Sequence, residues 1–270
     1  MTEAPAPATA ASPEGASAAM ERLARVQGPR ELHAAILALL LPRGSQRARR
    51  AWMAETPGIE GAAALRDAVK SLAPGARLPF FETLLERLAV QPMGARQDLI
   101  AATRRVMAAR GAVRPIDRLH WLLMRKALTN EEPPTVRGGG SADVAQWLQS
   151  EVMAIAGMSA YLSRMVPDEA HGRDWYESVV NPWRAHPELP AHHLPDAEAM
   201  VISYDSLLAL GWMQRPVLVR HWVSLAIDHG TQTRLDETAA DALRLMALLL
   251  DCPLPPELAR QFVARPFVGA

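Results

Sequence analysis

The stretch that decides the fold class is residues 29–42, which read PRELHAAILALLLP. Pro29 suits the first position of a helix, because the N–H that proline lacks has no partner there and its φ angle is already helical. Leu32, Ile36 and Leu39 recur at spacings of three and four residues, so they form one apolar stripe along that helix. Pro42 ends it. The apolar part is far shorter than the roughly 20 residues that a bilayer span needs.

The same helical spacing returns in nearly every segment between prolines and glycines, and no segment shows a sustained alternation of apolar and polar residues. We therefore expect an all-α fold of two helical units joined by a Gly/Pro linker. The expected parts are a disordered tail (1–22), a first helical unit (23–128), the linker (129–142), a second helical unit (143–263) and a short tail (264–270).

Two segments interrupt the helical pattern. Residues 129–142 contain paired acids, paired prolines and Gly138 to Gly140, a composition typical of a linker. Residues 166–195 are broken by five prolines and are expected to form a loop in the second unit. Residues 1–19 lack the basic start and apolar core of a secretory signal, so we expect a soluble, cytoplasmic protein with no membrane span.

The two halves resemble each other. When Gly111 is aligned with Gly230, Val106 meets Leu225 and Asp117 meets Asp236. In each half an apolar helix ends at a glycine, and an acid six residues later opens the next helix. This pattern predicts a duplicated helical unit, although short apolar helices also match one another by chance.

The charge and cysteine content exclude several classes of protein. Lys+Arg and Asp+Glu are both 29, which leaves no basic excess for nucleic acid or for an anionic membrane. All basic residues except Lys70 and Lys126 are arginines, a usage typical of GC-rich bacterial genomes. Cys252 is the single cysteine, so the chain has neither an internal disulfide nor a cysteine-rich zinc module.

The order of helix, glycine, polar turn, acid and apolar helix is similar to the TerB-like helical fold of tellurite resistance. A second resemblance covers roughly residues 28 to 258. LHAAILALLL (32–41), LPFFETLLERL (78–88), residues 111–123 and ALRLMALLLDCPLPP (242–256) resemble the cytoplasmic C-terminal region of HtpX-like, CAAX-protease-like membrane zinc metallopeptidases of proteobacteria. These resemblances imply a bacterial helical accessory region outside the peptidase domain.

The peptidase chemistry itself is not implied. In that family two histidines of an H-E-x-x-H helix bind zinc and the glutamate activates water, and no such motif occurs in this sequence. TerB-like units carry acids at the turn that supply oxygen ligands for a hard cation. Here the first turn lacks an acid beside Gly111, whereas the second has Asp228, Asp236 and Glu237. We therefore assign no catalytic, cofactor or metal residues, and leave a metal role open only for the second turn.

A second group of metal-ligand residues lies in the proline-rich loop. His186, Glu188, His192 and His193 fall within eight residues, and such side chains bind zinc or iron when they are held rigidly. Their spacing fits no known ligand pattern, which favours a polar surface connector instead. A metal-binding sensor or a metal-dependent enzyme that uses this loop or the acids near Asp228 is the alternative function.

Several isolated residues favour structural interpretations. Cys252 lies at the end of a helix, without the basic surroundings that activate a thiol. Ser159 lacks the second glycine and the preceding strand of a nucleophile elbow. Asp205, Asp228, His221 and His229 allow a His–Asp pair, but helix-end caps or surface positions are the simpler interpretation. The arginines near residue 47 allow contact with phosphate or an acidic partner, but a solvated helix face is the simpler interpretation. That cluster comprises Arg43, Arg47, Arg49 and Arg50.

The aromatic residues of the loop suggest a binding function. Trp175, Tyr176 and Trp183 lie in a non-periodic segment and could form an exposed anchor, because Trp and Tyr are enriched in interface hot spots. The alternative is that their rings cover the second helical unit. We expect a non-enzymatic, cytoplasmic adaptor or accessory protein that binds a protein partner, at the membrane face or in a stress-related assembly.

Overall fold

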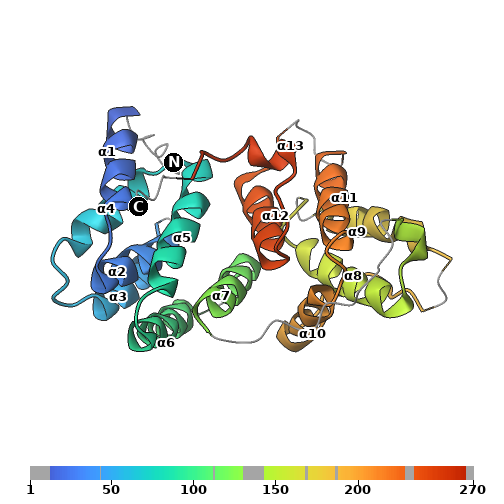
Figure 1. Ribbon diagram of the computed structural model, residues 1–270, viewed down its shortest axis with the longest axis horizontal. Coiled ribbons are helices and arrows are strands. Elements are labelled where there is room, and N and C mark those ends of the chain that lie inside the picture. The colour runs from blue at the N-terminus through green and yellow to red at the C-terminus, as the bar shows by residue number, and fades with distance from the viewer. Residues whose placement is uncertain are drawn as a thin grey trace, which may run out of the picture. The chain divides into compact units, whose positions relative to one another are not determined.

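The computed structural model describes residues 13–42, 44–111, 113–129, 143–167, 170–185, 188–228 and 234–265. These residues form thirteen α-helices and two short 3-10 helices, with no strand among them (Figure 1). The all-α expectation is therefore confirmed for this part of the chain. None of its helices combines the length with the hydrophobicity that a bilayer crossing requires.

The chain folds into two compact units, residues 1–112 with 263–270 and residues 113–262. We expected the boundary in residues 129–142, and this was wrong. Helix α7 (Pro115–Leu128) packs on α12 (Glu237–Leu249) and so belongs to the second unit. The Lys126 ammonium donates hydrogen bonds to the carbonyls of Leu248 and Leu249, at 3.1 and 2.9 Å. A Gly/Pro-rich stretch identifies a loop but not the neighbour of the helix before it.

The first unit is built around α2. Its helices are α1 (Pro13–Ala24), α2 (Pro29–Leu39), α3 (Gln46–Glu55), α4 (Ala62–Ser71), α5 (Pro74–Ala89) and α6 (Met93–Arg110). Helix α2 packs against α3, α4, α5 and α6, and its side chains from Ala34 to Leu39 are buried. Trp52 of α3 is buried too, and its indole N–H donates to the carbonyl of Ala34 at 3.0 Å. The apolar stripe of the sequence is thus the centre of this unit.

Both expected tails are partly ordered. Residues 13–22 belong to α1, so the prediction of disorder was wrong for them, and residues 1–12 lie outside the described part. The physical reason is that α1 packs on α4 and buries Leu23 completely. At the other end, Arg265 pairs with Glu82 at 2.6 Å and with Glu86 at 2.7 Å, which ties the C-terminal segment to α5.

The second unit contains α7, η1 (Val144–Gln146), α8 (Gln149–Leu162), α9 (Gly172–Val180), η2 (Asn181–Trp183), α10 (Ala197–Leu208), α11 (Gln214–Asp228), α12 and α13 (Pro256–Ala259). Helix α8 packs closely on α10, since a Cβ added at Gly157 would clash with the Ser203 Oγ. Helix α11 packs on both α9 and α12 and buries Trp222.

The segment 166–195 is not the continuous loop that we expected. It contains α9 and η2, and Pro182 lies in the first turn of η2, where a proline is tolerated. Trp175, Tyr176 and Val179 give α9 a buried face. The sequence pattern did not predict this short amphipathic helix, because the segment around it contains many prolines.

The predicted repeat is visible in the helix positions but not in the packing. Asp117 is in the first turn of α7, and Asp236 caps α12 by accepting a hydrogen bond from the Ala239 N–H at 2.7 Å. Helices α6 and α7, however, fall in different units, whereas α11 and α12 pack together in one. The duplication therefore stays a prediction.

Candidate protein-interaction surface

The three aromatic side chains that we predicted as an exposed anchor are buried. Trp175, Tyr176 and Trp183 are 0%, 2% and 3% exposed. The Tyr176 hydroxyl donates to the Pro190 carbonyl at 2.6 Å, and the Trp183 indole N–H donates to the Val144 carbonyl at the same distance. The anchor interpretation was therefore wrong. The three rings are instead packed within the second unit.

These rings fix the surrounding segments to one another. The Trp147 and Trp183 ring centroids are 5.7 Å apart, which joins η1 to η2. The Tyr176 ring stacks at an angle on His192, with centroids 5.1 Å apart. Burial raises the pKa of Tyr176 to about 12, so its hydroxyl stays protonated and keeps its donor role. The aromatic residues thus hold residues 188–195 against α9.

Two residues of the candidate metal loop, Glu188 and His192, make hydrogen bonds within the fold. His192 Nε2 lies 2.9 Å from the Ser163 Oγ, and Glu188 accepts a hydrogen bond from Gln149. Burial lowers the pKa of His192, with a further contribution from Arg173. His193 is exposed, and His186 lies outside the described residues. Within the described part of the chain, no group of three or more His, Cys, Asp or Glu side chains is placed to hold a metal ion.

The acids of the second turn lie at the ends of two helices, Asp228 at the end of α11 and Asp236 and Glu237 at the start of α12. Asp236 is the N-cap of α12, whereas Asp228 and Glu237 are exposed at the ends of two different helices. His221 Nε2 lies 2.9 Å from the Val179 carbonyl oxygen, which links α11 to α9. His229 and Gly230 lie outside the described residues.

Neither candidate nucleophile is in an activating environment. Ser159 is fully buried, and its hydroxyl accepts a hydrogen bond from the Trp222 indole N–H at 2.9 Å. Burial raises the pKa of the Cys252 thiol to about 12, so the reactive thiolate is not populated near neutral pH.

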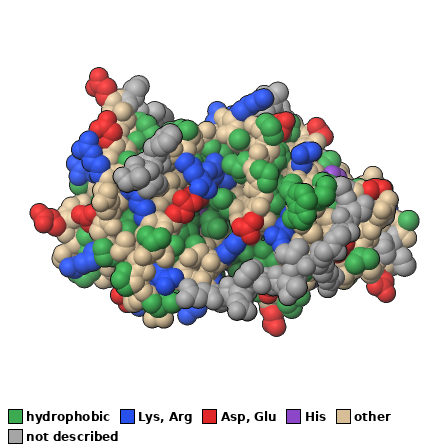
Figure 2. All heavy atoms as spheres, in the orientation of Figure 1, with side chains coloured by type: hydrophobic (Ala, Val, Ile, Leu, Met, Phe, Trp, Pro, Cys, Tyr) green, Lys and Arg blue, Asp and Glu red, His purple; other side chains and the backbone are tan. Residues whose placement is uncertain are grey.

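An exposed apolar cluster lies instead at the turn between α10 and α11. Trp212 is the one aromatic residue among the exposed large apolar side chains of the described residues, and it is 76% exposed. Its neighbour Met213 is 48% exposed. Leu148, which precedes α8, is 58% exposed. On the face drawn in Figure 2, basic and acidic side chains are interspersed with apolar ones, so no field of one sign covers that face.

A buried polar network holds this turn against α8. The Gln214 side-chain oxygen accepts a hydrogen bond from the Gly211 N–H at 2.8 Å. The Gln214 amide donates in turn to a Glu151 carboxylate oxygen at 3.3 Å, and the same oxygen accepts from the Leu148 N–H at 2.8 Å. Glu151 and Gln214 are both buried. Two side chains therefore connect the backbone before Trp212 to the backbone of Leu148.

We call Leu148, Trp212 and Met213 the Trp212 surface. The sequence did not predict this surface, because Trp212 lies in a short turn between two helices and not in a long irregular segment. The available signal was local: the turn between two helices reads Gly211-Trp212-Met213, where turns ordinarily carry polar residues. No family model, curated protein or solved structure matches this chain. The TerB-like and metallopeptidase-like resemblances therefore stay predictions.

Proposed function

We propose that this chain is a non-enzymatic accessory protein of the cytoplasm that binds a protein partner through the Trp212 surface. The observation that carries the proposal is an indole that is 76% exposed in a turn whose backbone is anchored by buried side chains. Tryptophan is one of the side chains enriched in interface hot spots. Isolated exposed apolar residues are common, but here an exposed tryptophan is followed by exposed Met213, and their turn is linked to the backbone of exposed Leu148, which makes a candidate binding surface.

The anchoring network supports binding because it reduces the entropy lost on association. A flexible loop would have to be ordered when the partner binds, at a cost that subtracts from affinity. Here Gln214 and Glu151 already fix the turn in the free protein. The partner that fits this surface presents an apolar pocket able to enclose an indole ring. The resemblance to the cytoplasmic region of membrane metallopeptidases favours a partner at the membrane face.

The test is a photo-crosslinking amino acid placed at position 212 of the full chain in its native host. The matched control is the same amino acid at Val90, an exposed apolar residue of the first unit. We expect a discrete crosslinked protein from position 212 and none from position 90. The partner identified by mass spectrometry is then purified, and its affinity is measured for the parent chain, Trp212→Ala and Val90→Ala.

Loss of the indole is expected to weaken binding by about 30-fold or more, the equivalent of a hot spot of at least about 2 kcal/mol. Val90→Ala should leave affinity unchanged. Equal affinity of the parent chain and Trp212→Ala would overturn the proposal. So would a crosslink from position 212 to a second copy of this chain, since the surface would then be a self-association interface.

A further inference from the structure

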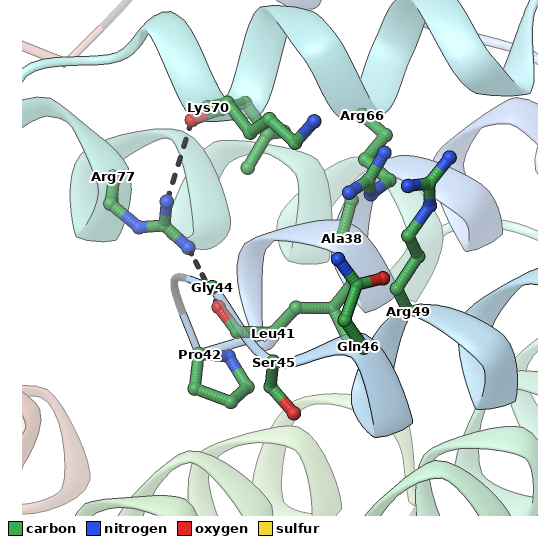
Figure 3. Close-up of a pocket in the computed structure, with 11 residues that line it drawn as sticks. Ala38, Leu41, Pro42, Gly44, Ser45, Gln46, Arg49, Arg66, Lys70 and Arg77 are labelled. Carbon is green, nitrogen blue, oxygen red and sulfur yellow. Dashed lines mark hydrogen bonds between the residues drawn. The ribbon is translucent and has the colours of Figure 1, made fainter. Parts of the chain in front are cut away.

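The first unit contains a basic pocket of about 220 Å³ between the end of α2, the start of α3 and the facing parts of α4 and α5 (Figure 3). None of the described residues that line it is acidic. Its basic residues are Arg49, Arg66, Lys70 and Arg77, and its apolar residues are Ala38, Leu41, Pro42 and Val69. The volume is below the roughly 300 to 1,000 Å³ of pockets for drug-sized ligands, so a ligand here must be small.

Arg77 contributes its charge while its donors serve the fold. Its guanidinium donates to the carbonyl oxygen of Leu41 at 3.2 Å and to that of Val69 at 3.4 Å (Figure 3). It also donates to the carbonyl oxygen of Leu39 at 2.9 Å. These carbonyls belong to the C-terminal ends of α2 and α4, where the helix dipole is negative. Arg77 thus covers these negative ends and leaves the pocket with a positive potential.

Arg49 and Arg66 have donors to spare. Figure 3 shows their guanidinium groups turned toward one another beside the Gln46 amide. Within the described residues the Arg49 side chain makes no hydrogen bond or ion pair. Asp67, which does not line the pocket, pairs with Lys70 at 3.1 Å and more distantly with Arg66 at 3.8 Å, beyond hydrogen-bonding distance. Two like charges that face each other repel, and an anion between them converts the repulsion into two charge-assisted interactions.

The start of α3 adds to the positive potential. Ser45 and Gln46 line the pocket, and the first turn of α3 has no acidic residue. The Ser45 hydroxyl accepts from the Ala48 N–H at 3.1 Å, so the helix is capped while its positive dipole end stays at the pocket. Guanidinium forks together with a helix N-terminus are the groups that recognise phosphate oxygens.

We propose that this pocket binds the phosphate group of a small phosphorylated molecule, with Arg49 and Arg66 holding the phosphate oxygens. The apolar wall formed by Ala38, Leu41 and Val69 accommodates the organic part of the same ligand. The site lies wholly in the first unit and does not depend on the Trp212 surface.

Calorimetric titration of the full chain with phenyl phosphate tests the proposal, with inorganic phosphate and benzoate as comparison ligands. We expect saturable binding of phenyl phosphate, and binding at least about tenfold weaker for benzoate, which offers fewer oxygens and less charge. Arg49→Ala and Arg66→Ala should each weaken phenyl phosphate binding by about tenfold or more. Arg50→Ala is the matched control, because it removes the same charge from an exposed position of the same helix and Arg50 does not line the pocket.

Flotation with vesicles that contain phosphatidic acid separates the two sources of the phosphate. Arg49-dependent binding to vesicles without phenyl phosphate binding would assign the site to a lipid headgroup, and the reverse would assign it to a free metabolite. Arg49 is exposed and its side chain makes no hydrogen bond or ion pair with another described residue, so Arg49→Ala should fold like the parent. The proposal is overturned if neither probe binds, if Arg50→Ala weakens binding as much as Arg49→Ala, or if benzoate binds as tightly as phenyl phosphate.

Discussion

Replacement of Gln214 by Ala is expected to destabilise the second unit strongly, although no apolar volume of note is lost. Its side chain joins the Gly211 N–H to the Glu151 carboxylate, and the side chains of Gln214 and Glu151 are both buried. A hydrogen bond to a neutral group contributes about 0.5–1.5 kcal/mol and one to a charged group about 1.5–3 kcal/mol. The two together predict a loss of about 2–4 kcal/mol, which corresponds to a fall in the melting temperature of roughly 5–15 °C for a unit of this size.

Urea denaturation followed by circular dichroism measures this loss. Gln146→Ala is the matched control, because Gln146 is exposed in the same unit. The hydrogen bond that its side chain makes with a described residue goes to Asp143, which is also exposed. The control should change the free energy of unfolding by less than about 0.5 kcal/mol. A Gln214→Ala variant as stable as the control would refute the reasoning that this network fixes the turn. Trp212→Ala, at a 76% exposed position, should also match the control.

Three further perturbations test other parts of the structure. Burial lowers the pKa of His33 below its ordinary value of 6.5, so the unfolded state binds more protons just below pH 6.5 and the first unit should lose stability as pH falls through that window. His33→Gln should flatten this dependence in urea titrations, and an unchanged slope would contradict it. A Cβ at Gly172 would lie 2.5 Å from the backbone carbonyl oxygen of Ser163, so Gly172→Ala should cost about 1–3 kcal/mol of unfolding free energy. Gly94 has open space around it, so Gly94→Ala should be neutral or stabilise by up to about 1 kcal/mol. Equal melting temperatures of the two variants would count against the close contact. Arg265→Ala leaves the buried Glu82 without this partner and should cost about 1–3 kcal/mol by thermal unfolding, and no loss would show that the C-terminal segment does not hold α5.

Local rules predicted the helices well where the signal lies within one turn. Pro29 opens α2 and Asp236 caps α12, as the sequence indicated. Both effects depend on groups a few residues apart in the chain, so no knowledge of the fold is needed. The same rules misjudged residues 166–195, because prolines at helix ends and prolines in a loop have the same local signature.

Burial of the aromatic residues could not be predicted from their neighbours in the chain. Trp183 is buried because its indole N–H reaches the Val144 carbonyl, 39 residues away. Trp212 is exposed because Gln214 and Glu151 hold its turn at the surface. Both tryptophans lie in short connections between longer helices, and only the partners contributed by segments distant in the chain distinguish them.

The sequence by itself determined that this chain is helical, neutral in charge and free of an H-E-x-x-H motif, because each of these depends on composition or on residues within one helical turn. The tertiary structure decided which unit α7 joins, which tryptophan is exposed and which arginines face each other. Arg49 and Arg66 belong to different helices, and their charges meet only because α3 and α4 both pack on α2. Helical periodicity is a property of neighbouring residues, whereas burial and charge convergence depend on which helices pack together.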